Sequence, residues 1–322
     1  MFSSGQIKAA SITELNPQVT ADATLHFEQI FSTGVLLSDS ESLSFGVSNF
    51  DPNSVVSTSD RFEVIDNSER RNKLKVFTVP LGIELDSERY FFDELKLKFS
   101  YVDQNEKQEF ALDDSENVSQ SSTDTIYTIY AGLTKNYALS KRWELKAGAG
   151  VYLMYHENDH QYLGNDADKI DTELEGLINN TYATAALIEP YAHFNYVKNK
   201  NWGHWKWQTR AGIFTGIGVT GSASAKGAEP SGWKFTNGVK YFYNLTNDNT
   251  NAEQFYLKFH RIDLNGDMVS TIGTHYYYEL GLGILFNTKG RIPWLDNAGI
   301  GININQGSDL SGGSIVLYFN EL

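Results

Sequence analysis

The chain has 322 residues, 41% of them hydrophobic, and carries a formal net charge of −14. It can therefore bury a core, and because no stretch approaches the roughly 18 consecutive apolar residues of a membrane helix, helical membrane proteins are excluded. The negative charge excludes general binding to nucleic acid, and the absence of cysteine excludes disulfide frameworks and thiolate metal sites.

The N-terminal segment, residues 1–40, differs from the rest of the chain. Its first six residues lack the basic and apolar regions of a secretory signal, so we expect the signal to be absent from this chain. Asn16 followed by Pro17 is a favourable helix start. Apolar residues then recur at helical spacing, which predicts one amphipathic helix over 17–33. These residues are Val19, Ala23, Phe27, Ile30 and Phe31.

Over residues 41–322 apolar and polar residues alternate, which predicts β-strands. The clearest example is 205–219, where Ile213 and Ile217 share the apolar face while Lys206 and Arg210 share the other. About twelve such segments follow one another, and many are as long as the roughly 9–11 tilted residues that cross a bilayer. We therefore predict an all-β fold, a twelve-stranded antiparallel transmembrane β-barrel.

The alternative is a soluble sandwich or lipocalin-like barrel, whose apolar strand faces point inward. The connections favour the membrane barrel, because long acidic stretches such as 103–124 and 157–180 alternate with shorter ones. Glycines on the polar face, such as Gly148 and Gly150, indicate a face crowded by other atoms. A narrow lumen filled by a plug would provide such crowding.

Two segments carry a family resemblance: YALSKRW at 137–143, and LKAGAGVY at 145–152. With the preceding helix and the strand number, they resemble the translocator domain of the bacterial autotransporter superfamily, and most of all its solitary barrels, which lack a passenger. The resemblance implies an outer-membrane barrel with a helix in its lumen. The closing segment 312–319 resembles the assembly signal of such proteins, although Leu317 stands where an aromatic residue is usual.

One local cluster has residue types suited to a metal or to hydrolysis: His156, Asp159 and His160. We expect it in a loop beyond a strand that ends near Tyr155, where histidines four apart need not share a face. The acidic residues that follow lack the spacing of a calcium loop. They are Asp166, Asp168, Asp171, Glu173 and Glu175. We therefore predict a solvated acidic loop, with no metal, cofactor or catalytic residue.

Turning the polar strand faces inward predicts a lumen with more basic than acidic residues. These are Lys96, Lys98, Lys146, Lys206, Arg210, Lys234, Lys240 and Lys258, with Glu84, Glu144, Glu189 and Glu279. The segment before the barrel is mainly acidic, with Glu14, Asp22, Glu28, Asp39 and Glu41. Because charges removed from water need partners, we predict that the helix, with Asp22, His26 and Glu28, lies in the lumen as a plug. A wide hydrated channel is the alternative.

These features predict a non-enzymatic protein of the bacterial outer membrane, acting as a plugged or narrow pore or as an envelope-assembly component. A surface adhesin that acts through the acidic loops is a second hypothesis, and a rim hydrolase a third. The expected partners are outer-membrane lipids, lipopolysaccharide and the barrel assembly machinery. We expect a monomer that binds no nucleic acid.

Overall fold

The structure is a computed structural model that describes residues 17–39, 43–50, 73–86, 88–110, 118–163, 175–245, 253–292, 295–308 and 310–319. The described residues contain three helices, α1 (Pro17–Leu37), α2 (Ala223–Gly227) and α3 (Met268–Ile272). Their strands are β1 (Leu43–Phe50), β2 (Lys73–Glu84), β3 (Glu94–Phe110), β4 (Val118–Ala138), β5 (Trp143–Leu163), β6 (Tyr182–Lys200), β7 (Gly203–Thr220), β8 (Ser231–Asn244), β9 (Glu253–Gly266), β10 (Tyr276–Ile292), β11 (Leu295–Gly307) and β12 (Leu310–Phe319). None of the helices among these residues is long and apolar enough to cross a membrane.

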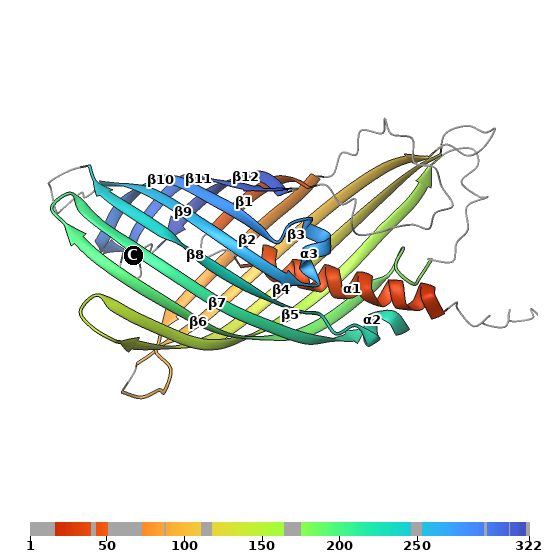
Figure 1. Cartoon of the computed structure of the whole chain (residues 1–322), viewed down its shortest axis with the longest axis horizontal. Coiled ribbons are helices and arrows are strands. Elements are labelled where there is room, and N and C mark those ends of the chain that lie inside the picture. Colours follow the sequence, from red (N-terminus) through yellow and green to blue (C-terminus); the bar gives the residue numbers. More distant parts are fainter. Residues whose placement is uncertain are drawn as a thin grey trace, which may run out of the picture.

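The strands form one closed barrel, in which each pairs with its neighbours along the chain and β1 pairs with β12 (Figure 1). The closing pair is antiparallel, with its register running from Leu43 opposite Leu317 to Phe50 opposite Leu310. Since every strand has a partner on both sides, the ring has no edge strand. The predicted all-β antiparallel barrel is confirmed.

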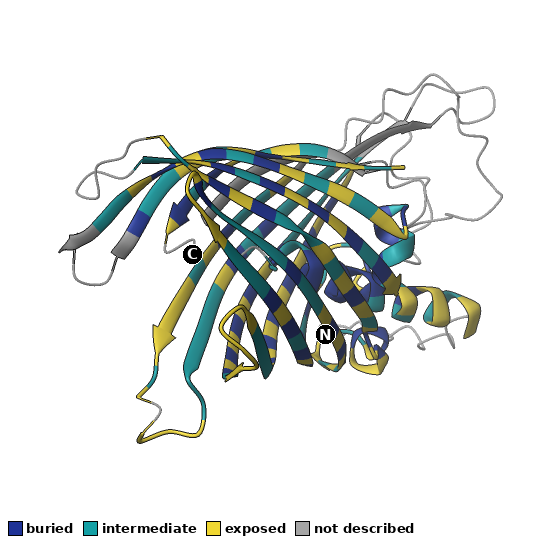
Figure 2. Ribbon diagram, turned by 60° about the vertical axis from the view of Figure 1, so that its left-hand side comes forward, coloured by how far each residue is buried: buried dark blue, intermediate teal, exposed yellow. Residues whose placement is uncertain are grey.

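The apolar faces of the strands point outward. In β7, Ile213 is 63% exposed and Ile217 is 58% exposed, whereas Phe214 between them is buried. The same alternation of exposed and buried residues runs along β6 and along residues 149–161 of β5 (Figure 2). A soluble sandwich or lipocalin-like barrel would bury these apolar faces, so that alternative is excluded, and an outward apolar band is the surface that lipid requires.

Helix α1 is longer than the predicted 17–33, because it continues to Leu37. The extra turn forms since Val35 and Leu36 are buried along with the rest of the apolar face. Ser38 follows the helix, and its backbone N–H and its hydroxyl both donate to the carbonyl oxygen of Gly34, at 3.1 and 2.6 Å. The hydroxyl also lies 3.2 Å from the carbonyl oxygen of Val35, one of the groups that a helix C-terminus leaves without an intrahelical partner.

Two short helices lie in connections between strands, α2 between β7 and β8 and α3 between β9 and β10. α2 begins after Ser222, whose Oγ accepts the backbone N–H of Ala225, and α3 ends at Gly273 in the left-handed conformation. Both lie at the rim from which the N-terminal end of α1 emerges, and both pack against α1 (Figures 1 and 2). The barrel mouth at this rim is therefore covered by three helices.

Several strands extend beyond the predicted loop boundaries. β5 continues to Leu163 because its ladder with β4 runs without a break to the pair Ser119 and Leu163. The stretch 103–124, predicted as a loop, contains the ends of β3 and β4. The prediction that His156, Asp159 and His160 lie in a loop is therefore wrong, since all three belong to β5.

Candidate functional site

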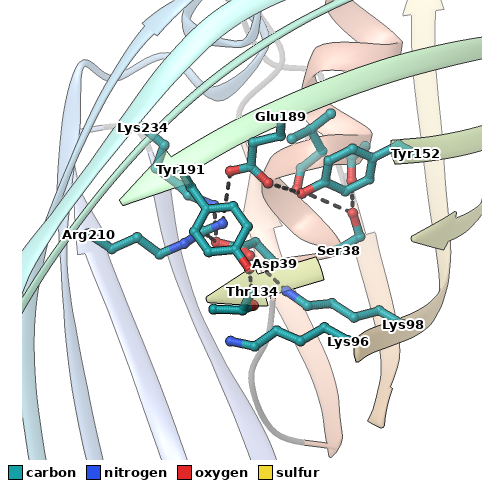
Figure 3. Close-up of polar contacts among 12 residues, drawn as sticks. Ser38, Asp39, Lys96, Lys98, Thr134, Tyr152, Glu189, Tyr191, Arg210 and Lys234 are labelled. Atoms are coloured by element: carbon teal, nitrogen blue, oxygen red, sulfur yellow. Dashed lines mark hydrogen bonds and ion pairs between the residues drawn. The ribbon is translucent and has the colours of Figure 1, made fainter. Parts of the chain in front are cut away.

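Asp39, two residues after α1, is the centre of an ion cluster inside the barrel (Figure 3). Its Oδ1 accepts from Lys98 Nζ of β3 at 2.8 Å, and its Oδ2 accepts from Arg210 Nη1 of β7 at 2.7 Å. Lys234 of β8 forms a third ion pair with the same carboxylate. Since β3 lies four strands from β7 and five from β8 in the barrel order, Asp39 joins well-separated parts of the wall.

The cluster holds Asp39 in its charged form. Burial alone would raise the pKa of the Asp39 carboxyl, but Arg210, Lys234 and Lys98 outweigh burial and hold that pKa well below its ordinary value. A carboxyl group with a lowered pKa adds stability above its ordinary pKa and loses it only as the pH falls through the lowered one. The anchor at Asp39 is therefore intact at neutral and mildly acidic pH.

Glu189 of β6 supplies the second carboxylate of the cluster. It is 1% exposed, and its two oxygens accept from Arg210 Nη2 at 2.9 Å and from the Tyr152 hydroxyl at 2.7 Å. Gly212 of β7 lies beside it, where an added Cβ would collide with the Glu189 carboxylate. A buried charge needs such partners on both oxygens, and Arg210 links Glu189 to Asp39.

Aromatic rings of the wall surround the two carboxylates. Lys98 Nζ lies 5.3 Å from the centre of the Tyr130 ring, and the Arg210 guanidinium lies 4.9 Å from that of Tyr191. The Tyr130 ring occupies the space that Gly150 leaves free. The strand face that carries Gly150 is therefore crowded, as the sequence predicts. The crowding atoms at Gly150 belong to Tyr130 of the wall and not to the predicted plug.

Between its two ends α1 carries buried hydroxyl groups, and so does the wall. Ser32 and Thr33 of α1 are buried, as are Thr78, Ser100 and Thr128, which lie directly opposite one another on β2, β3 and β4. Within the part of the chain that the structure describes, these five hydroxyls have no hydrogen-bond partner. Ile30 of α1 packs with Val102 of β3 and Ile126 of β4, so apolar packing, and not the hydrogen bonds of these hydroxyls, holds the middle of the helix.

The outer end of α1, where it emerges from the barrel, packs into an apolar cluster. Phe27 and Phe31 are 0% exposed and belong to the same core as Met268 and Ile272 of α3. Ala225 of α2 is buried in that core as well. The helices at the rim therefore hold this end of α1 mainly through burial of apolar surface.

A histidine cluster adjoins the apolar cluster. His156 of β5 is 0% exposed, and its Nε2 lies 2.8 Å from Oδ1 of Asp124 on β4. The rings of Phe27 and Phe31 meet the His156 ring edge to face at 6.0 and 6.5 Å. His26, the residue before Phe27 in α1, is electrostatically coupled to both His156 and Asp124.

The predicted lumen residues are only partly brought together. Lys98, Glu189, Arg210 and Lys234 meet at Asp39, whereas Lys258 pairs with Glu279 and Lys96 lies 3.8 Å from Glu94. Glu144 accepts from Asn195, and Glu84 is exposed at the end of β2. Lys206, Lys240 and Lys258 lie directly opposite one another on β7, β8 and β9, and Lys146 is half-buried on β5.

The acids of α1 itself behave differently from the prediction. Asp22 is exposed and accepts from Gln18, and Glu28 accepts the backbone N–H of Glu229. The described acid that pairs with the wall cations is Asp39, beyond the helix, while Glu14 and Glu41 lie outside the described residues. The sequence analysis missed Tyr152. This residue lies on the same face of β5 as Lys146 and Gly150, so following that face two residues beyond Gly150 would have identified it.

The candidate metal residues do not converge. Asp159 points to the opposite face of β5 from His156 and His160. Across the described residues, no group of three or more His, Cys, Asp or Glu side chains could hold a metal ion. Of the acidic run that follows, Asp166, Asp168, Asp171 and Glu173 lie outside the described residues.

The chain is similar to one protein family and to several solved structures. The family described as "Solitary outer membrane autotransporter beta-barrel domain" matches residues 28–321. The transport unit of the autotransporter AIDA-I from Escherichia coli is 9% identical, with 90% of this chain and 96% of that chain covered and a TM-score of 0.49. The translocator domain of the autotransporter NalP from Neisseria meningitidis is 12% identical, with 94% and 98% covered and a TM-score of 0.48. These likenesses concern the fold alone, and no curated protein matches the chain.

Proposed function

This chain belongs to the family of solitary outer-membrane autotransporter β-barrel domains, and we propose that it works in the bacterial outer membrane as a pore closed by its own helix α1. The observation that carries the proposal is the Asp39 cluster. It joins the end of α1 to β3, β7 and β8, which lie on different sides of the barrel. A helix held in this way obstructs the path of a solute.

The charge of the wall supports a preference of the open pore for anions. The inward-facing residues described above include more lysines and arginines than acids, and basic rings or stripes favour anions in a pore. We expect this selectivity to weaken at high salt, because salt screens the wall charges. Replacing Lys206 with Glu, away from the Asp39 cluster, should shift the preference toward cations.

A disulfide that fixes α1 in the lumen tests the proposal. The sequence has no cysteine, so an introduced pair can be studied alone. A Cβ placed on Gly34 would lie 3.4 Å from Cγ2 of Ile126 on β4 and 3.2 Å from Sδ of Met154, so a cysteine at Gly34 would face one at Ile126. We expect the oxidised Gly34→Cys, Ile126→Cys protein to conduct poorly in planar bilayers, and the reduced protein to show additional openings.

The matched control places the second cysteine on the outward face of the same strand. Ile129 is 57% exposed, so Gly34→Cys with Ile129→Cys should form no disulfide and should not respond to reduction. Equal conductance of the oxidised and reduced Gly34→Cys, Ile126→Cys proteins, with the disulfide shown by mass spectrometry, would contradict the pore proposal.

The other candidate functions have less support. An adhesin would act through acidic connections, most of which lie outside the described residues. A rim hydrolase would need His156 to reach a substrate, whereas His156 is buried beneath Phe27 and Phe31. We propose outer-membrane lipids and lipopolysaccharide as the partners of the outward apolar faces, and the barrel assembly machinery as a partner during insertion.

A further inference from the structure

Two histidines lie at the junction between the outer half of α1 and the wall. His156 of β5 is fully buried, and its Nε2 is bonded to the Asp124 carboxylate at 2.8 Å. Because a carboxylate can only accept, this Nε2 carries the hydrogen and Nδ1 of the neutral ring does not. His26 of α1 lies close enough to influence both groups, and its ring meets that of Phe27 edge to face at 5.8 Å.

Protonation of the His26 imidazole would add an N–H in an unfavourable place. Nδ1 of His26 is buried and has no hydrogen-bond partner within the described residues. Both nitrogens of a protonated ring carry hydrogen, so Nδ1 would be a donor without an acceptor, beside the Phe27 ring. A buried donor without a partner, and still more a buried charge, destabilises the state that buries it.

Few nearby charges offset a proton at this site. Among the elements packed on α1, β4 supplies the Asp124 carboxylate, β5 supplies His156 and His160, and β8 supplies Lys234, which pairs with Asp39. α2 carries Lys226, which is exposed, and Asp267 before α3 accepts from the backbone of Ser231. Asp124, which also accepts from Asn158, is thus the carboxylate that opposes burial at His26.

We propose that His26, beside His156 and Asp124, is an acid-sensitive latch, which holds the outer half of α1 in the lumen while the His26 ring is neutral and loosens it when that ring is protonated. The inference rests on the proposed function only in that α1 is the plug. It concerns the outer half, since the inner end is held by the Asp39 ion cluster. Acid should therefore open the mouth of the barrel without detaching the helix.

The direction and size of the effect follow from His26. Burial, the largest influence, lowers the pKa of His26 from 6.5 to about 4, with Asp124 opposing it and His156 reinforcing it. A loosened helix therefore binds more protons than a docked one between these two values, and docking weakens as the pH falls through this window. At pH 4.5 we expect the docking equilibrium of the outer half to be weaker by on the order of a hundredfold than at pH 7.5.

Thiol protection measures this equilibrium in the intact, full-length protein. Ala23 of the outer half is 2% exposed, whereas Leu25 is 46% exposed. The labelling rate of Ala23→Cys by dithiodipyridine, divided by that of Leu25→Cys at the same pH, gives a protection factor free of the intrinsic pH dependence of thiols. We expect this protection to fall by on the order of a hundredfold between pH 7.5 and pH 4.5.

Three histidine variants and a second thiol position separate the latch from general loosening. His26→Phe should abolish most of the fall, and His156→Gln, which keeps a donor for Asp124, should reduce it. His275→Asn, at an exposed histidine before β10, should leave it unchanged. Ser38→Cys, at the 0% exposed inner end, should stay protected at both pH values.

The possible results each decide the proposal. Unchanged protection at Ala23→Cys in acid, an equal fall in the His26→Phe background, or a matching fall at Ser38→Cys would overturn the latch. Protection that falls as expected without a rise in conductance would support the latch and contradict the pore function. Conductance that rises in acid while Ala23→Cys stays protected would overturn the latch and leave the pore function standing.

Discussion

The two ends of α1 are held in the barrel by opposite kinds of chemistry. At the inner end, Asp39 draws three cations from β3, β7 and β8 around one carboxylate. At the outer end, Phe27 and Phe31 are buried among apolar residues of α2 and α3 beside the His156 ring. Ion pairs depend on each partner being present, whereas apolar burial is spread over many atoms, so the two ends should respond differently to the same perturbation.

The two ends of α1 should also come loose at different pH values. Asp39 keeps its charge in mild acid because the surrounding cations hold its pKa down. His26 of the outer end is disfavoured in its charged form by burial, which lowers its pKa to about 4, so the outer end should loosen in acid before the inner end does. The inner end of α1, beside the cations of the wall, should therefore stay in place in mild acid. The outer end, among apolar residues, should come loose there.

The largest effect should come from breaking the inner end. Asp39→Asn keeps the shape of the side chain but leaves Lys234 and Arg210 without the negative charge that compensates them. Removing one partner of a buried ion pair destabilises by about 3–5 kcal/mol. Urea unfolding in lipid vesicles should report this loss in the free energy of unfolding, together with increased conductance in planar bilayers.

The matched control for this variant is Asp103→Asn. Asp103 pairs with Lys75 at 3.1 Å, but the Lys75 side chain is 63% exposed. Exposed pairs contribute about 0–1 kcal/mol, so the control should lose little stability. Equal losses in the two variants would remove the contrast between a buried anchor and a surface pair.

A smaller effect is expected from the outer end. Ile272 of α3 is 0% exposed within the apolar cluster, and Ile272→Ala should lower the free energy of unfolding by about 3 kcal/mol through lost burial and a residual cavity. The variant should loosen the outer half while Ser38→Cys remains protected from thiol reagents. Loss of protection at Ser38→Cys as well would mean that the two ends act as one unit.

The smallest effect tests the periphery of the inner cluster. Tyr152→Phe removes the hydroxyl that donates to Glu189 at 2.7 Å but leaves Arg210 bound to that carboxylate. A hydrogen bond to a charged group contributes about 1.5–3 kcal/mol, and the remaining Arg210 bond places the expected loss near the lower value. A loss as large as that of Asp39→Asn, measured by the same urea titration, would show that Tyr152 belongs to the anchor itself.

Strand faces were the most predictable part of this molecule. Alternation in 205–219 assigned Ile213 outward and Arg210 inward, because a period of two leaves only one choice once a single face is fixed. Helix α1 was predicted from its apolar spacing, but its last turn depends on burial of Val35 and Leu36 inside the barrel. That burial is tertiary, so local periodicity does not contain it.

The candidate site was less predictable. Charge complementarity suggested pairing between the N-terminal segment and the wall, but which acid takes part depends on where the chain passes Lys98, Arg210 and Lys234. α2 and α3 escaped prediction because five-residue helices are too short to show a period, and packing on α1 stabilises them. His156 was assigned to a loop because strand pairing beyond Tyr155 is decided by β4, not by β5 alone.

The junction between Asp39 and β1 sets how α1 can move. Only residues 40–42 separate Asp39 from Leu43, the first residue of β1, and three residues span at most about 10–11 Å. A released helix therefore remains tethered to the wall, and its return is an intramolecular event. Short tethers give effective concentrations in the millimolar range, so reclosing should be fast and independent of the amount of protein in the membrane.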